Sequence, residues 1–282
     1  IDPIEAVRMA SLNAAECYGL ADRGAIAPGL RADIVLADNL TDYHVQKVWI
    51  AGELVAKDGE YLFPVERTDM TVVTGKFHVK DFSEEKLKLH LKSSKVKVID
   101  ILPGGVVTGK GEAEVKLDQD GDFVYDPDQD IVKVTVVERH HATGNVGVAL
   151  LRGYGIQKGA VAISIAHDSH NIIAVGTNDK DIAFAVEQLI SQGGGIVLAN
   201  EQKVVDSMPF VVGGIMTDQT GEWVNEHLTR VHENARKCLG ISGEVEPIMT
   251  LCFMSLPVIP ALKLTDMGLF DVTTFAFTSI EA

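Results

Sequence analysis

The amino-acid sequence predicts an α+β protein, with a small strand-rich part followed by a larger mixed α/β part. Its 282 residues exceed the ~100–200 residues usual for one domain, which favours two domains. Most apolar segments are short and rich in β-branched residues, as in strands. A few segments combine the periodicity and the end signals of helices, so we expect helices and strands together in an α+β arrangement.

A helix is predicted at the start of the chain, over residues 2–19. Asp2 can cap its N-terminus, Pro3 suits the first helical position, and Glu5 completes a capping box. Gly19 is suited to end the helix, because glycine readily adopts left-handed backbone angles. Because the chain opens directly into this helix without an initiator Met, we expect it to be a piece of a longer protein.

Short strands separated by turn residues follow the helix. A turn at residues 51–53 is expected to join two of them as a hairpin. The more charged residues 63–103 are expected to connect this small sheet to the larger part, and they contain a predicted helix over 83–91. The three predicted strands of the small sheet are 32–38, 45–52 and 53–59.

The larger part combines predicted strands with two longer helices. The helix over 178–195 has Asn178 as its expected cap and glycines at its end. The helix over 220–240 is amphipathic. Its apolar face consists of Trp223, His227, Leu228, Val231 and Ala235. The predicted strands are 95–102, 106–117, 131–139, 146–155, 160–165, 171–177, 195–200 and 203–216, before an apolar tail at 256–272.

An acidic stretch, residues 118–130, lies between two of these predicted strands. It is similar in composition to a calcium-binding loop, but it lacks the ligand spacing and the late Glu of an EF-hand. We therefore predict that this stretch is a solvated turn.

The charge balance and the cysteines bear on partners and compartment. Lys and Arg total 25 against 40 Asp and Glu, a net charge of −15, which argues against nucleic-acid and anionic-membrane partners. No apolar run approaches the ~20 residues of a transmembrane helix. Three cysteines without CxxC spacing suit a reducing compartment, so we expect a soluble cytoplasmic protein in which Cys252 packs as a small hydrophobe.

Two polar loops carry four of the nine histidines. The stretch AHDSHN, residues 166–171, follows an apolar run, and HHATGNVG, residues 140–147, follows another predicted strand. Imidazole titrates near neutral pH and binds metals, so one interpretation is a metal site or an acid/base site. The other is a polar corner in which Asp168 and Asn171 cap backbone groups and the imidazoles satisfy one another. The residues alone leave both interpretations open.

Other site motifs are absent from the sequence. HHATGNVG is not a P-loop, because it lacks the Gly-Lys-Ser/Thr ending, and the GGG at 193–195 suits a helix end. There is no GxSxG nucleophile elbow and no HxH pair.

Four stretches carry a family resemblance: GAIAPGLRADIVLADN, KVWIAGELVAKDGEY, RHHATGNVGVALLRGYGIQKGAVAISIAHDSHNIIAVGTNDKD and LPVIPALKLTDMGLFDV. Together they resemble the C-terminal half of bacterial and archaeal adenine deaminases, in the amidohydrolase superfamily. The first stretch alone would indicate only an amidohydrolase, whereas the long third stretch is specific to adenine deaminases. The resemblance covers nearly the whole chain and is weakest at residues 63–100.

The resemblance implies conversion of adenine to hypoxanthine and ammonia by metal-bound hydroxide, at a binuclear divalent metal site that holds Mn or Fe, or else Zn. In the family the metal ligands lie in a TIM-like barrel and include an HxH pair, and none has a matching position in this chain. The barrel is therefore expected to be absent apart from its last helix, and the chain alone is expected to be inactive. The implied parts are the last barrel helix (1–20), part of a small β-sandwich (21–62), a connecting region (63–103) and a C-terminal domain (104–282).

The resemblance also refines the two interpretations of the histidine loops. AHDSHN belongs to the C-terminal domain rather than to the metal ligands, so it either lines the substrate pocket or locks the domain onto the barrel. As pocket residues, the catalytic candidates are His167, Asp168 and His170, and the substrate-binding candidates are His141, Asn145 and Asn171. Strands 131–139 and 160–165 are expected to share a sheet, which would bring His141 beside His167 or His170.

The expected partners are adenine, the barrel segment and further copies of the chain in a homo-oligomer. Two other functions stay open: a non-catalytic docking or dimerisation module, and an independent metal site formed by the histidines. Amidohydrolase sandwiches combine segments from both sides of the barrel. The small sheet is therefore expected to leave a strand edge unpaired, or covered by another chain.

Overall fold

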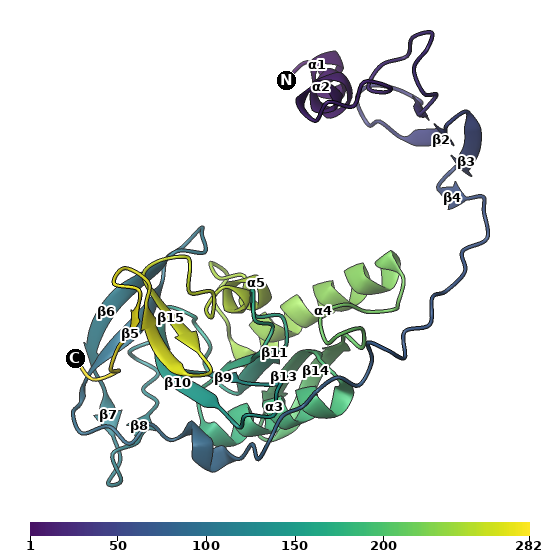
Figure 1. Ribbon diagram of the computed structural model, residues 1–282. Coiled ribbons are helices and arrows are strands. Elements are labelled where there is room, and N and C mark those ends of the chain that lie inside the picture. The colour runs from purple at the N-terminus through teal and green to yellow at the C-terminus, as the bar shows by residue number, and fades with distance from the viewer. The chain divides into compact units, whose positions relative to one another are not determined.

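The computed structural model describes all 282 residues, and the chain divides into two compact units, Ile1–Thr68 and Asp69–Ala282 (Figure 1). The smaller unit contains the first helix and the small sheet. The larger unit begins within the predicted connecting region and includes the strand predicted at 95–102. Both units mix helices with sheets, so the predicted α+β class is confirmed.

The predicted first helix forms in the smaller unit, with one irregular turn. Its segments are α1 (Pro3–Arg8), a π-helical turn (Met9–Asn13) and α2 (Ala14–Cys17). Asp2 caps it as predicted, because its Oδ1 accepts hydrogen bonds from the backbone N–H of Ile4 at 2.9 Å and of Glu5 at 3.2 Å. Gly19 follows the helix with a φ of +67°.

The small sheet is antiparallel and open. Its strands are β1 (Ile34–Ala37), β2 (Val45–Ile50), β3 (Glu53–Lys57) and β4 (Glu60–Tyr61), paired in sequence order. Ala51 and Gly52, with φ of 53° and 84°, make the predicted hairpin turn between β2 and β3. β1 pairs only with β2, so its outer edge is unpaired as expected, whereas β2 is paired on both sides.

The larger unit is built on an eight-stranded mixed sheet. In spatial order its strands are β14 (Lys203–Pro209), β13 (Gly195–Asn200), β11 (Ala160–Ile163), β12 (Ile172–Gly176), β9 (Ile131–Val137), β10 (Val146–Arg152), β5 (Lys95–Ile101) and β6 (Thr108–Glu114). Only the β10–β5 pair is parallel. β9 and β11 share this sheet as predicted, with β12 between them.

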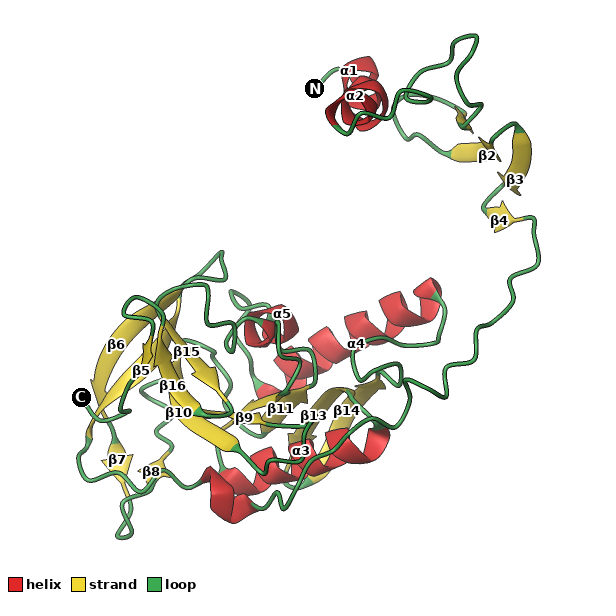
Figure 2. Cartoon of the chain, in the orientation of Figure 1, coloured by secondary structure: helices red, strands yellow, loops and turns green.

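Helices cover both faces of this sheet (Figure 2). They are α3 (Asp179–Gln192) on one face and α4 (Gly221–Leu239) with α5 (Pro247–Cys252) on the other. Because successive side chains of a strand point to opposite faces, β11 packs Ala160 and Ala162 against α3, and Val161 and Ile163 into the core on the other face.

The C-terminal segment completes the core on the face of α4 and α5. It forms β15 (Leu262–Thr265), β16 (Gly268–Asp271) and β17 (Ala276–Phe277). Leu262, Leu264 and Leu269 belong to the same core as Val231 and Ala235 of α4, which confirms the buried part of the predicted helix face. Cys252 lies in this core and is 4% exposed, as expected of a small hydrophobe.

The helix predicted over 83–91 is wrong. Only a 3₁₀ turn, Glu84–Leu87, forms there. The following backbone is held by the acidic stretch instead: the Leu89 N–H donates to Asp122 Oδ1 at 3.0 Å, and the Leu91 N–H donates to the Gly121 carbonyl at 2.8 Å. These long-range bonds take donors that a longer helix would use within itself.

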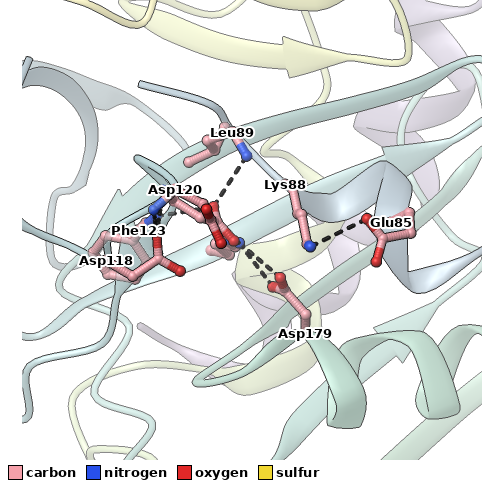
Figure 3. A network of polar contacts seen from close by, with 9 residues as sticks. Glu85, Lys88, Leu89, Asp118, Asp120, Phe123 and Asp179 are labelled. Atoms are coloured by element: carbon pink, nitrogen blue, oxygen red, sulfur yellow. Dashed lines mark hydrogen bonds and ion pairs between the residues drawn. The ribbon is translucent and has the colours of Figure 1, made fainter. Parts of the chain in front are cut away.

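The acidic stretch is only in part the solvated turn that composition predicted, because its turns at 119–120 and 127–128 are exposed but the residues between them are not all so. It contains β8 (Phe123–Val124), which pairs with β7 (Lys116–Leu117), and Asp122 is only 8% exposed. The buried Lys133 Nζ lies 2.9 Å from Asp122 Oδ2 and 2.9 Å from Asp179 Oδ1. Figure 3 shows Leu89 and Asp179 in this network. The carboxylates thus tie the loop to the sheet and to the start of α3.

Two further predictions need correction in extent. The strand predicted over 203–216 ends at Pro209, and residues 106–117 form two strands, β6 and β7, rather than one. The short helix α5 was not predicted from its apolar run, because a six-residue helix without a charged face has no amphipathic period to detect.

Candidate functional site

The two histidine loops meet at one end of the large sheet. The His140 Nε2 lies 2.7 Å from the Ser169 carbonyl oxygen, which joins the loop after β9 to the loop after β11. Arg139 reinforces this junction, because its Nε donates to the His170 carbonyl at 2.5 Å and its backbone N–H donates to Asn171 Oδ1 at 3.3 Å. We call this set, residues 138–145 and 167–171, the histidine corner.

The imidazoles of the histidine corner form two pairs. The rings of His167 and His170 lie edge to face with centroids 5.6 Å apart, and the rings of His140 and His141 are 6.4 Å apart. His167 also packs on Phe253, at 4.9 Å between ring centroids. The contact between the loops is made by His140, whereas the expectation named His141, whose side chain is exposed.

His170 carries a free ring nitrogen inside the corner. Its Nδ1 is buried and has no hydrogen-bond partner. Burial lowers the pKa of His170, and the neighbouring His167 and the Arg139 guanidinium lower it further. His170 is therefore neutral at pH 7, with a nitrogen available to accept or donate a proton.

Glu138 holds the loop that contains His140 and His141. One carboxylate oxygen accepts the N–H of His140 at 2.5 Å and of His141 at 2.7 Å, and the other accepts the N–H of Thr143 at 3.0 Å. Burial alone would raise the pKa of Glu138, but these backbone donors outweigh it and lower the pKa to about 2.

Arg139 is a buried arginine that clamps three segments together. It is 2% exposed, its Nη2 donates to the Gly213 carbonyl at 3.0 Å, and its guanidinium lies 4.4 Å from the ring centroid of Phe77. Burial lowers its pKa to about 10. Neither Glu138 nor Arg139 was predicted, although a charged pair at the end of the apolar strand IVKVTVV was the available signal.

The predicted binding residues Asn145 and Asn171 converge on one carboxylate. The Nδ2 of Asn145 donates to Asp266 Oδ2 at 3.0 Å, and the Nδ2 of Asn171 lies 3.4 Å from Asp266 Oδ1. Asn171 is 5% exposed and Asp266 is half-buried. Asp266 was not predicted, and it lies in the turn between β15 and β16.

A cavity of about 300 Å³ lies beside these residues. The exposed Asp168 is part of its lining, and it is the one predicted catalytic residue that lines the cavity. Ser255 lies at the cavity, 3% exposed, and its Oγ has no hydrogen-bond partner. The full lining is Asp168, Ser169, Ser255, Leu256, Pro257, Val258, Thr265 and Asp266.

The histidine corner does not fit a metal centre. No group of three or more His, Cys, Asp or Glu side chains in the chain is arranged to hold a metal ion. The His167 and His170 rings pack edge to face, with their centroids 5.6 Å apart. What the corner offers is the neutral imidazole of His170 inside it and, at the small cavity, the exposed carboxylate of Asp168.

Comparison with known proteins identifies the family. Residues 105–276 match the model of the adenine deaminase C-terminal domain. The chain belongs to the adenine deaminase C-terminal domain family. The histidine corner and the cavity both lie within the matched residues, and residues 1–55 match the amidohydrolase family.

Relatives of this adenine deaminase domain are similar along the whole chain. It is 60% identical over 282 residues to an adenine deaminase 2 of Desulfotalea psychrophila, covering 100% of this chain and 49% of that protein. Identity is 50% over 281 residues to an adenine deaminase of Ligilactobacillus salivarius, covering 100% and 49%. It is 46% over 280 residues to one of Nitratidesulfovibrio vulgaris, covering 99% and 48%.

The chain spans about half the length of the curated relatives it matches. The matches to the family model and to these relatives confirm the predicted family. No helix of the chain has the length and apolar character needed to cross a membrane.

Proposed function

We propose that this chain works as part of an adenine deaminase, which adds water to adenine and releases hypoxanthine and ammonia. The family match over residues 105–276 and the relatives named adenine deaminase along the whole chain support this proposal. The divalent metals, Mn or Fe, or else Zn, would be held by a barrel segment outside these 282 residues, which span about half the length of the relatives.

Within that enzyme, the histidine corner would line the adenine site. His167, Asp168 and His170 would act on the substrate, and His141, Asn145 and Asn171 would bind or orient it. The observation that carries this assignment is the buried, unpartnered Nδ1 of a neutral His170. A neutral imidazole can accept a proton from, or return one to, a reacting group, and loss of ammonia requires such a proton transfer.

The test is substitution of His170 in the full-length protein that contains this chain. We expect His170→Ala to lower kcat for adenine about 100-fold or more, the usual weight of an acid/base group, with little change in melting temperature. His170 has a φ of +51°, so His170→Asn is a second variant that tolerates this backbone and also removes the imidazole.

His44→Ala is the matched control, since the His44 side chain is 75% exposed in the smaller unit. Unchanged kcat in both His170 variants, with a lower melting temperature, would mean that the histidine corner is structural. That result would leave the adenine deaminase proposal intact and remove only the role assigned to His170.

A non-catalytic docking module is the second candidate function. The exposed apolar side chains of the smaller unit favour it, because Tyr18 is 81%, Ile26 83% and Val35 49% exposed. The two candidates differ in one assay. A docking module would bind a partner segment while adenine turnover by the joined proteins stayed unaffected by substitutions in the histidine corner.

We also propose that the protein is a cytoplasmic homo-oligomer. The net charge of −15 and three free cysteines support a soluble protein in a reducing compartment. The open edge of β1 supports association with another chain or segment. Light scattering coupled to gel filtration measures the mass directly, and a monomer across the micromolar range would contradict this proposal.

A further inference from the structure

The cavity next to the histidine corner has features of a binding site for the adenine base. We propose that Ser255 and Asp266 bind the adenine ring in this cavity, as specificity-determining residues that the family resemblance did not point to. This inference rests on the proposed adenine deaminase function. Two polar groups support it, because each has hydrogen-bonding positions that no other group of the protein occupies.

The first group is the Ser255 hydroxyl. Ser255 is 3% exposed, its Oγ has no partner, and it lies in the cavity lining. Buried hydroxyl groups are nearly always hydrogen-bonded, since an unsatisfied one is unfavourable. Because the Oγ is itself closed off from solvent, the hydroxyl would have to rotate towards the cavity to meet a ligand there. A ring nitrogen of a purine is an acceptor for the hydroxyl proton.

The second group is the Asp266 carboxylate, which is fixed in place. Asn145 and Asn171 donate to its two oxygens at 3.0 and 3.4 Å, and this orients it. A carboxylate has about four acceptor positions, so about two of them stay unused on Asp266, which is part of the cavity lining. They call for N–H donors, which adenine presents on its exocyclic amine and on one ring nitrogen.

The remaining walls fit a flat, uncharged ring. Leu256, Pro257 and Val258 form an apolar side, and the volume of about 300 Å³ is at the lower end of small-molecule sites. Asp168 and Asp266 place two carboxylates in the lining, which repel anions. The cavity therefore favours the free base over a nucleotide, whose phosphate would be disfavoured here.

Ser255→Ala and Asp266→Asn in the full-length protein test this proposal. We expect each to raise KM for adenine about tenfold, the weight of one hydrogen bond to a ligand. Ser255→Ala should keep or raise the melting temperature, because it removes a buried hydroxyl that has no partner in the protein. Matched controls are Ser83→Ala and Asp218→Asn, both at exposed positions outside the cavity, which should leave KM unchanged.

Each outcome decides the proposal. KM within twofold of wild type in both variants overturns it, and the adenine deaminase function then stands by itself. A lowered melting temperature with unchanged KM would show that the cavity is filled by a protein side chain, and it also overturns the proposal. A wild-type protein without activity on adenine overturns the proposed function and this inference together.

Discussion

Replacing Glu138 by glutamine should destabilise the larger unit at neutral pH and flatten its stability profile in acid. Glu138 is 5% exposed, and its pKa falls from 4.5 to about 2 in the folded protein. At about 1.36 kcal/mol per pKa unit, this shift corresponds to about 3 kcal/mol of stability at pH 7. Glutamine keeps one acceptor oxygen but turns an amide N–H₂ towards the N–H donors of the loop.

The pH dependence follows from the direction of the shift. Because the folded pKa is depressed, the stabilisation is fully present above pH ~4.5 and is lost as the pH falls towards 2. At pH 3 about 1 kcal/mol of it should remain. Glu138→Gln should therefore lose about 3 kcal/mol relative to wild type at pH 7, and the difference should shrink steadily in acid.

Urea denaturation of the 282-residue chain, followed by tryptophan fluorescence, measures this difference. Trp49 lies in the smaller unit and Trp223 in the larger, so a Trp49→Phe background makes the signal report on the larger unit. Glu187→Gln is the matched control, since Glu187 is exposed on α3. The reasoning is refuted if Glu138→Gln changes stability by less than about 0.5 kcal/mol at pH 7, the size of an ordinary surface substitution.

Two further predictions concern buried groups of the larger unit. Lys133→Met should cost about 3–5 kcal/mol in the same denaturation assay, because it leaves the Asp122 and Asp179 carboxylates together without their shared cation, and a cost below about 1 kcal/mol would show that the carboxylates relax. Cys252, whose pKa burial raises to about 12, should resist a thiol reagent at pH 8 until the chain unfolds, while the exposed Cys17 reacts at once; labelling of Cys252 in the folded chain, identified by mass spectrometry, would contradict this.

The elements that sequence alone predicts well are those whose signals are local. Asp2 and Asn178 cap their helices as expected, and the turn at Ala51 and Gly52 forms the hairpin. A cap or a turn depends on neighbours within a few residues, so it can be predicted from the local sequence. Residues 83–91 show the opposite case: the helix does not form because backbone N–H groups of this segment donate to residues 121 and 122, which no local pattern contains.

The prediction for the acidic stretch, residues 118–130, was incomplete for a related reason. Composition describes the average setting of Asp, which is solvent, but the fold places Lys133 behind this loop and fixes Asp122 against it. An isolated Lys within the apolar strand IVKVTVV was a sign that an acidic partner must approach, since a buried charge needs one. The pairing partner itself could be found only from the sheet order, which brings the loop to that strand.

The histidine corner shows how far a site can be derived from its residue types. The loops were expected to meet because their strands share a sheet, and they do, but through His140 and Arg139 rather than His141. The Glu138 carboxylate accepts from backbone N–H groups and the Arg139 guanidinium donates to the carbonyls of His170 and Gly213, and so both side chains set the positions of the loops. The atoms left without partners are the His170 Nδ1 and, in the cavity, the Ser255 hydroxyl. Because a buried polar atom without a partner is unfavourable, these atoms, more than the conspicuous histidine count, indicate where a ligand is expected.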